Sequence, residues 1–456
     1  MKRGSRRPAN ATSRERSSTE QARRSVRRRA NVPVRSEAPQ LSWAERVRSA
    51  VRAGNFPRVN GEADGLLFGA VVALIVFGVV MVYSASSVRA VRMHGDGHHF
   101  LIRQALYAAV GLPLLFGLSR VDYHVYRPLA RAFLLCSFAL MLVVALGFGR
   151  TAGGATRWIQ LGPVNIQPSE VAKVGLILWL SDSLARKAER VRQFSVGFVP
   201  HMSVVGLLVV LCMAQPDFGS SVILVVLTYV LLFVAGAKAS HLLLGAAVAL
   251  PPAYWALRSV PWRWKRIIAF TDPFEYRTSG GYQIVESWLS FGAGGATGVG
   301  LGDSRQKLLF LPEAHTDFIA AIVAEELGFV GFSLMVSAFV IVVVRGLRGA
   351  FRAPEPFGAF LGVGLSMFIG IQAVTNLAVV LGLLPTKGLT LPFVSSGGSS
   401  LLVNCAAVGV LLNLSRPRST LVDVDPSTPA VREPRGRGKS ARAGAFGSLA
   451  SEGGAQ

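Results

Sequence analysis

The chain has 456 residues, of which 51% are hydrophobic and only 16% are charged, against about 25% charged in an ordinary soluble domain. Much of its formal charge of +23 lies in two polar tails: residues 1–60 hold 16 Lys and Arg against 4 Asp and Glu, and residues 416–456 hold 7 against 4. These values exclude a water-soluble enzyme of average composition and predict an integral membrane protein.

Both ends of the chain are predicted to be disordered tails. Residues 1–64 form a basic tail and residues 416–456 a second one, because segments of low hydrophobicity and high charge cannot offset the entropy lost on ordering. We expect both tails to be cytoplasmic. The basic tail is expected to be solvated. If it binds, the anionic inner leaflet or an acidic partner is favoured, and no nucleic acid is expected to bind.

The core, residues 65–415, is divided into ten apolar runs bounded by charge or by Gly and Pro. The fold class expected is therefore all-α, a polytopic integral membrane protein of about ten transmembrane helices. A long extracytoplasmic loop, residues 259–315, separates spans seven and eight. The ten predicted spans are 65–85, 101–119, 128–148, 167–185, 197–214, 217–236, 240–258, 316–345, 357–384 and 398–415.

The short loops differ in basic residues between the two sides of the membrane. With the N-terminal tail inside, the inside loops contain Arg120, Arg127, Arg186, Lys187, Arg190, Arg192, Lys238, Arg348 and Arg352. The short outside loops contain only Arg89, Arg92, Arg150, Arg157 and Lys387. This asymmetry follows the positive-inside rule. The long loop 259–315 is basic although it lies outside, and an anionic ligand would explain why.

Polar residues gather where the even-numbered spans begin, which is the outer face in this topology. Helix N-termini present unpaired amide donors and a partial positive charge, and both suit phosphate. These polar starts are therefore candidates for binding a phosphorylated ligand. They are Gln167–Glu170 with Lys173, Gln215–Asp217, His315–Asp317 and Ser395–Ser400.

Each polar group also has a purely structural explanation. Three of them, Ser169, Asp217 and Thr316, could simply cap helices, which is the commonest role of such residue types at a helix start. Glu170 and Lys173 are three residues apart and could form no more than an ion pair. Asp317 is harder to explain in this way, since a carboxylate just inside a span is costly and usually marks a site or pathway. Glu325 and Glu326, deeper in the same span, are interpreted as structural.

Several motifs occur together in a fixed order along the core. They are Arg157–Ile159, Gln167–Glu170 with Lys173, Gln215–Asp217, Gly300–Lys307, Leu311–Ile319, Glu325–Gly328 and Leu384–Pro392 leading to Ser399 and Ser400. This series resembles the signature of the SEDS family, which comprises FtsW, RodA and SpoVE. Tyr83–Ser86, residues 312–317 and Thr386–Leu389 look more like the cell-division branch, FtsW, than the elongation branch, RodA. Two residues depart from the family pattern: Ser396 stands where Tyr is usual, and Ala320 where Phe is common. Neither change replaces a charged residue, so only local packing should differ.

Members of this family are peptidoglycan glycosyltransferases that polymerise lipid II, an undecaprenyl-pyrophosphate-linked disaccharide peptide. The resemblance implies that Asp317 is the catalytic carboxylate, with Glu170 and Lys173 nearby in a central cavity. It also implies a divalent cation, Mg²⁺ or Mn²⁺, whose ligands the sequence does not identify. The partners implied are a class B penicillin-binding protein and other division proteins. The location implied for the chain is the bacterial cytoplasmic membrane, at the division septum.

The outer face restricts the chemistry, since it offers neither ATP nor nucleotide sugars. A polyprenyl-pyrophosphate sugar carries its own activation, and its leaving group needs no general acid. Asp317 would then accept the proton of the attacking hydroxyl. Cations and oriented amides would hold the pyrophosphate, and the candidates are Arg157, Lys173, Lys307 and the helix start at Ser399 and Ser400.

Three other functions remain open from the sequence. A lipid II flippase would also have ten spans, but a carrier should place polar residues across the whole membrane thickness, whereas here they crowd the outer ends. An elongation-type polymerase would use the same chemistry in another process. A non-catalytic scaffold is suggested by the long tails alone.

Overall fold

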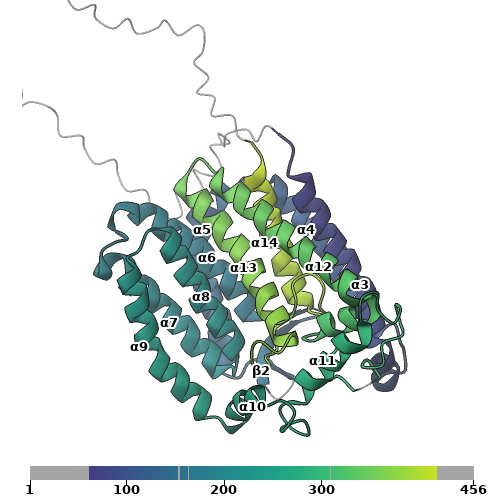
Figure 1. Cartoon of the computed structure of the whole chain (residues 1–456). Coiled ribbons are helices and arrows are strands. Elements are labelled where there is room, and N and C mark those ends of the chain that lie inside the picture. Colours follow the sequence, from purple (N-terminus) through teal and green to yellow (C-terminus); the bar gives the residue numbers. More distant parts are fainter. Residues whose placement is uncertain (1–60, 153–154, 163, 309, 418–456) are drawn as a thin grey trace, which may run out of the picture.

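The computed structural model describes residues 61–152, 155–162, 164–308 and 310–417. The predicted tails lie outside these ranges, apart from residues 61–64 and 416–417. Within the described residues, ten long helices run back and forth along one axis (Figure 1). They are α3 (Gly65–His94), α4 (His99–Arg120), α5 (Tyr126–Ala145), α6 (Pro168–Lys187), α7 (Val199–Ala214), α8 (Phe218–Val234), α9 (Ala239–Arg258), α12 (Ile319–Phe351), α13 (Pro356–Val380) and α14 (Gly398–Ser415).

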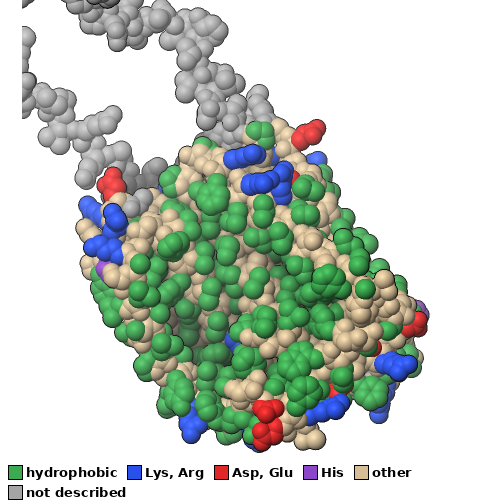
Figure 2. Space-filling model, in the orientation of Figure 1, with side chains coloured by type: hydrophobic (Ala, Val, Ile, Leu, Met, Phe, Trp, Pro, Cys, Tyr) green, Lys and Arg blue, Asp and Glu red, His purple; other side chains and the backbone are tan. Residues whose placement is uncertain are grey.

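Composition makes these helices membrane-spanning. Eight of the described helices are long and apolar enough to cross a bilayer. Of the other two, α8 is apolar but has only 17 residues, and α6 carries charged residues at both ends. Hydrophobic side chains cover the middle of the molecule, and most of the Lys and Arg in view lie toward its two ends (Figure 2). The prediction of an all-α polytopic membrane protein is confirmed.

A small sheet connects α5 to α6, where the sequence predicted none. It consists of β1 (Arg150–Ala152), β2 (Ala155–Leu161) and β3 (Val164–Ile166), antiparallel in the order β1-β2-β3. Thr, Trp and Ile in β2 favour extended backbone, but the strands are too short to show a clear alternation. The sheet matters because it carries Arg157.

The segment 259–315 is not an irregular loop. It contains α10 (Pro261–Thr271) and α11 (Tyr282–Gly294). Pro261 suits the first position of a helix because its missing N–H would have no partner there. The sheet, α10 and α11 all lie at one end of the bundle, here called the loop end (Figure 1).

The helices differ from the predicted spans in their limits, as the first and the eighth show. The first helix continues past residue 85 to His94. The eighth span was predicted to begin at residue 316, but α12 begins at Ile319, so Asp317 lies in the turn ahead of it. Helix α12 is also broken at Gly328, whose φ of 64° and ψ of −164° are not helical.

Helix α13 lies at the centre of the packing. It contacts α12, α6, α8 and α14, while α14 packs closely against α4 and α5 against α6. Helix α9 lies at the periphery and has no buried residue. At the end opposite the loop end, Asp64 caps α3, forms an ion pair with Arg345 of α12 at 2.6 Å, and donates its backbone N–H to Ser415 Oγ. These contacts connect α3, α12 and the end of α14 at the end of the bundle opposite the loop end.

Candidate active site

Asp317 is held at the loop end by a side-chain amide from α13. Asn376 Nδ2 donates to the backbone carbonyl of Asp317 at 2.8 Å and to that of Leu389 at 2.6 Å. The carboxyl group faces the segment before α14, since a Cβ added to Gly388 would lie 3.2 Å from Asp317 Oδ2. Asn376 therefore fixes the acid against a loop that is distant in sequence.

The surroundings of Asp317 raise the pKa of its carboxyl group. Burial raises this pKa to about 7, and the negative charge of Glu313 acts in the same direction, whereas Arg266 and Arg157 lower it. Although burial opposes ionisation of Glu313, Arg89 lies 2.9 Å away and lowers the pKa of Glu313. A carboxyl group with a pKa near the working pH is suited to accept and release a proton.

Two arginines lie within electrostatic reach of Asp317. Arg266 of α10 donates to the carbonyl of Thr386 at 3.3 Å. Arg157 of β2 donates from Nε to the carbonyl of Gln215 at 3.0 Å and also to that of Pro216. Because these acceptors are neutral, both guanidinium charges are available to an anion.

A cavity lies on the Arg266 side of this group. It has a volume of about 290 Å³ and is here called the α10 cavity. Its lining includes Arg266, Tyr282, Gln283, Pro312 and Thr386. The cavity thus combines polar and aromatic side chains with one cation, Arg266, which also acts on the charge of Asp317.

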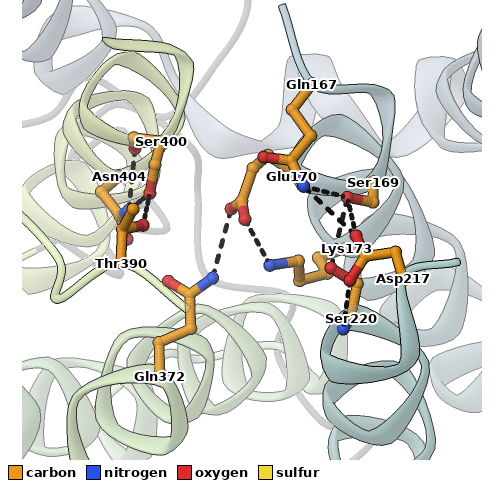
Figure 3. Close-up of polar contacts among 10 residues, drawn as sticks. All are labelled: Gln167, Ser169, Glu170, Lys173, Asp217, Ser220, Gln372, Thr390, Ser400 and Asn404. Atoms are coloured by element: carbon orange, nitrogen blue, oxygen red, sulfur yellow. Dashed lines mark hydrogen bonds and ion pairs between the residues drawn. The ribbon is translucent and has the colours of Figure 1, made fainter. Parts of the chain in front are cut away.

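Glu170 and Lys173 meet as predicted, in an ion pair deeper in the bundle (Figure 3). Lys173 Nζ lies 2.6 Å from Glu170 Oε1, and Gln372 Nε2 of α13 donates to Glu170 Oε2 at 3.2 Å. Lys173 is fully buried and lies over the ring of Phe368. Gln372 is one helical turn from Asn376, so α13 contacts both this pair and the Asp317 turn.

The polar start of α6 joins that of α8 (Figure 3). Asp217 accepts hydrogen bonds from Ser169 Oγ at 3.0 Å, Gln167 Nε2 at 3.2 Å and the Ser220 N–H at 3.1 Å. The capping role is confirmed for Asp217. Thr316 does not cap α12, since its hydroxyl donates to Glu313.

Lys307 is not brought to the Asp317 group. Its ammonium lies 3.1 Å from Glu326 Oε1 and 3.4 Å from Ser84 Oγ. Glu325 accepts hydrogen bonds from Ser304 and from the Arg305 N–H. Both glutamates therefore have the structural role expected of them, and Glu326 balances the charge of Lys307.

Ser399 and Ser400 lie in the first turn of α14. Ser400 Oγ accepts hydrogen bonds from Thr390 Oγ1 and Asn404 Nδ2, each at 3.2 Å (Figure 3). Ser399 is buried, and its hydroxyl has no partner among the described atoms. The Ser399 hydroxyl therefore keeps its hydrogen-bonding capacity for a ligand, and among the described residues the Ser400 O–H still has a free donor.

Four residues at the site were missed as functional candidates: Arg266, Glu313, Gln372 and Asn376. Gln372 and Asn376 had a usable signal, because amides four residues apart inside an apolar span are costly unless they have a role. Arg266 lies in the segment 259–315, which was noted as basic, and Glu313 lies in the motif Leu311–Ile319. Their relation to Asp317 depends on folding.

The described residues do not fit a metal site built from protein ligands. Within the described ranges, no group of three His, Cys, Asp or Glu side chains comes together. The Mg²⁺ or Mn²⁺ implied by the family resemblance remains a prediction, and no catalytic step is derived through it.

The core of the chain is similar to known proteins. A family model described as "Cell cycle protein" and named for FtsW, RodA and SpoVE matches residues 65–420. A Geobacter sulfurreducens protein named "Probable peptidoglycan glycosyltransferase FtsW" is 46% identical over 345 residues, which are 75% of this chain and 92% of that protein. Stage V sporulation protein E of Bacillus subtilis is 41% identical over 354 residues, 77% of this chain and 97% of that one.

Two solved structures share the fold. One chain of a peptidoglycan synthase complex, solved for the coordination of polymerization and crosslinking, has a TM-score of 0.66 and 29% identity, covering 78% of this chain and 99% of that one. The rod shape determining protein RodA of Thermus thermophilus has a TM-score of 0.59 and 28% identity, covering 78% and 98%. The chain therefore belongs to the FtsW/RodA/SpoVE family, the SEDS family that its motifs resemble.

Proposed function

We propose that this chain polymerises lipid II into glycan strands on the outer face of the cytoplasmic membrane, for the septal wall made in cell division. The chain is a peptidoglycan glycosyltransferase, as its FtsW relatives at 39–47% identity are named. The division role is supported by the FtsW relatives at 45–47% identity. The RodA structure at 28% is less similar.

The observation that supports this chemistry is the setting of Asp317. A half-buried carboxyl group with a pKa of about 7 lies within electrostatic reach of two arginines, and one of them, Arg266, lines the α10 cavity. In the proposed reaction the sugar hydroxyl of one lipid-linked substrate attacks the anomeric carbon of another. Asp317 accepts the hydroxyl proton, while Arg266 and Arg157 stabilise the diphosphate that leaves. Direct displacement of this kind inverts the anomeric carbon.

The orientation proposed places the loop end outside the cell and both termini in the cytoplasm. This follows from the basic residues of the short loops at the opposite end, such as Arg120, Arg186 and Arg352. It also agrees with the substrate, because only a lipid-linked donor brings activation energy to that face. A flippase would need a polar path along the bundle axis, whereas Asp317, Arg266 and Arg157 gather at one end.

A class B penicillin-binding protein is the partner proposed, with other division proteins at the septum. Its support is the likeness to one chain of a peptidoglycan synthase complex that couples polymerization and crosslinking. Such a partner would crosslink the strands that this chain makes.

The test is polymerisation of lipid II by the purified full-length chain in detergent, where no leaflets exist. Glycan strands should form, and Asp317→Asn should lower the rate by at least about 10²-fold, the lower range for loss of a general base. Asp303→Asn is the matched control, since Asp303 is an exposed carboxylate of the same segment. Normal polymerisation by Asp317→Asn would refute the assignment. No polymer from the wild-type chain, alone or with its penicillin-binding partner, would refute the function.

A further inference from the structure

One part of the loop end lies at the boundary of the membrane: residues 254–265, here called the α9–α10 junction. Helix α9 is apolar, has 20 residues and contains no buried residue. At about 1.5 Å per residue it is about 30 Å long, the thickness of the hydrocarbon core, so its exposed side faces lipid. Pro261 begins α10 only two residues after α9 ends at Arg258, and the two helices meet at the loop end (Figure 1). The start of α10 is therefore at the level of the lipid headgroups.

The junction is basic, and no acid in the described part of the chain balances it. Arg258 and Lys265 are exposed and form no ion pair with any described residue. No Asp or Glu occurs in residues 239–271. The next acid, Asp272, accepts a hydrogen bond from the Glu275 N–H and forms no ion pair with a described cation.

Other cations of the segment 259–315 have a partner or a role. Arg277 forms one ion pair at 3.2 Å and Lys307 another at 3.1 Å. Arg266 belongs to the candidate active site. Apart from Arg305, the unpaired cations of this segment among the described residues are those of the junction, so the basic character of the segment still needs an anion there.

Aromatic rings lie beside the junction cations. Tyr254, Trp255 and Trp262 are exposed. Tyr and Trp are enriched where a membrane meets water, because each has an apolar body and one polar group. The Arg258 guanidinium lies over the Trp264 ring, 4.8 Å from its centroid. Cations next to such rings at headgroup depth favour a negatively charged lipid headgroup.

A hydrogen bond fixes how the two helices meet. Arg263 Nη1 of α10 donates to the carbonyl of Ala256 in α9 at 3.1 Å, and the Arg263 guanidinium lies over the Trp262 ring. The Arg263 side chain is only 8% exposed, yet its Nε has no hydrogen-bond partner among the described atoms. A buried N–H without a partner calls for a ligand or water. A phosphate oxygen at the junction would accept this hydrogen bond.

We propose that the α9–α10 junction binds the headgroup of an anionic phospholipid, such as phosphatidylglycerol, in the leaflet at the loop end. Arg258 and Lys265 provide the charge, Arg263 provides the free N–H, and the exposed rings hold the junction at headgroup depth. The ligand is a lipid of the surrounding membrane and not the substrate.

The same helix carries Arg266 to the active site. The Arg266 guanidinium lies 5.2 Å from the centroid of the Trp262 ring and donates to the Thr386 carbonyl at 3.3 Å. A headgroup bound at the junction therefore holds α10, and with it Arg266, at a fixed depth beside the loop that precedes α14. Loss of the lipid should slow the reaction although the active-site residues are unchanged, and this consequence alone rests on the proposed function.

The binding test measures which phospholipid lies next to the junction of the full-length chain. Ser259 is exposed between the two helices, so Ser259→Cys can carry a fluorescent label in a Cys136→Ala background, since Cys212 and Cys405 are buried. The vesicles contain equal amounts of phosphatidylglycerol and phosphatidylcholine, and the tails of one lipid or of the other carry bromine, a short-range quencher. Bromine on phosphatidylglycerol should quench the label more strongly than bromine on phosphatidylcholine.

Arg258→Gln combined with Lys265→Gln should remove this difference, because each basic side chain near an anionic leaflet contributes on the order of a fivefold preference. Arg258→Lys combined with Lys265→Arg keeps both charges and should keep the difference. Arg305→Gln is the matched control, since Arg305 is an exposed arginine of the same segment outside the junction. Equal quenching by the two lipids before the glutamine changes, or a preference that survives them, would overturn the proposal. So would displacement of phosphatidylglycerol by an equal amount of lipid II, which would make the junction a substrate site.

The activity test compares lipid II polymerisation in vesicles with and without phosphatidylglycerol. The chain with both charges should be roughly fivefold faster with phosphatidylglycerol, and the glutamine pair should show no such gain. An equal gain in both would overturn the link between the bound lipid and Arg266. In detergent without phospholipid the two chains should polymerise at the same rate, so absence of polymer there from the wild-type chain reports failure of the proposed function and not of lipid binding.

Discussion

At the scale of single residues, the behaviour of Asp317 is set by charges from its own turn and from two distant segments. Glu313 precedes it in the same turn, Arg266 comes from α10 and Arg157 from β2. Burial and Glu313 raise its pKa, and the two arginines lower it. The same arginines that would stabilise the leaving diphosphate thus also keep a fraction of Asp317 ionised near neutral pH.

The pH dependence of polymerisation should report this balance. The base form of Asp317 is deprotonated, so the rate should rise with pH through an inflection near its pKa of about 7. Arg266→Gln removes a charge that lowers this pKa and should move the inflection to higher pH. Glu313→Gln removes a charge that raises it and should move the inflection to lower pH.

The measurement is the initial rate of lipid II polymerisation across the pH range at a substrate concentration well below half-saturation, because kcat/KM reports the pKa of the free enzyme. Arg92→Gln serves as the control, since Arg92 is exposed at the same end and does not contribute to the pKa of Asp317. An inflection that stays in place in both site variants would mean that a group other than Asp317 controls the rate.

At the scale of elements, the break in α12 joins it to the segment after α11. Val299 and Gly300 donate their N–H groups to the carbonyls of Glu325 and Glu326, while Phe329 donates to the carbonyl of Gly295. Backbone that leaves the helical pattern inside a bundle must find such partners. Gly328 permits this exchange, because an added Cβ would lie 2.3 Å from the Gly298 nitrogen.

Gly328→Ala should therefore destabilise the protein. The positive φ alone costs about 1–3 kcal/mol, and the contact with Gly298 adds to it. The thermal unfolding midpoint in detergent should fall, and Gly206→Ala in α7 should leave it unchanged or raise it, since nothing lies within 4 Å of a Cβ there. Equal midpoints for the two variants would contradict the role given to this break.

At the scale of the whole molecule, the sequence could predict what depends on composition. The ten apolar runs predicted the ten long helices. The polar starts of α6, α8 and α14 lie at the same end of the bundle, as predicted. The pair of Glu170 and Lys173 was predictable because its members are three residues apart on one helix.

Contacts between distant segments were beyond the sequence. Asn376 supports a residue 59 positions away, and no periodicity indicates such a pairing. Lys307 was grouped with the phosphate-binding cations because its charge lies in the basic outer segment, but Glu326 pairs with it. The sheet was missed because strands of three to seven residues give little pattern.

The central claim is that the acid works on the outer face, where a lipid-linked diphosphate sugar is the available donor. The direct measurement is labelling of single cysteines with a membrane-impermeant maleimide in intact cells, in a Cys136→Ala background because Cys136 is exposed while Cys212 and Cys405 are buried. Asp303→Cys should be labelled without permeabilisation. Arg352→Cys, at the opposite end of α12, should be labelled only after it. The reverse pattern would put Asp317 on the cytoplasmic side and contradict the account.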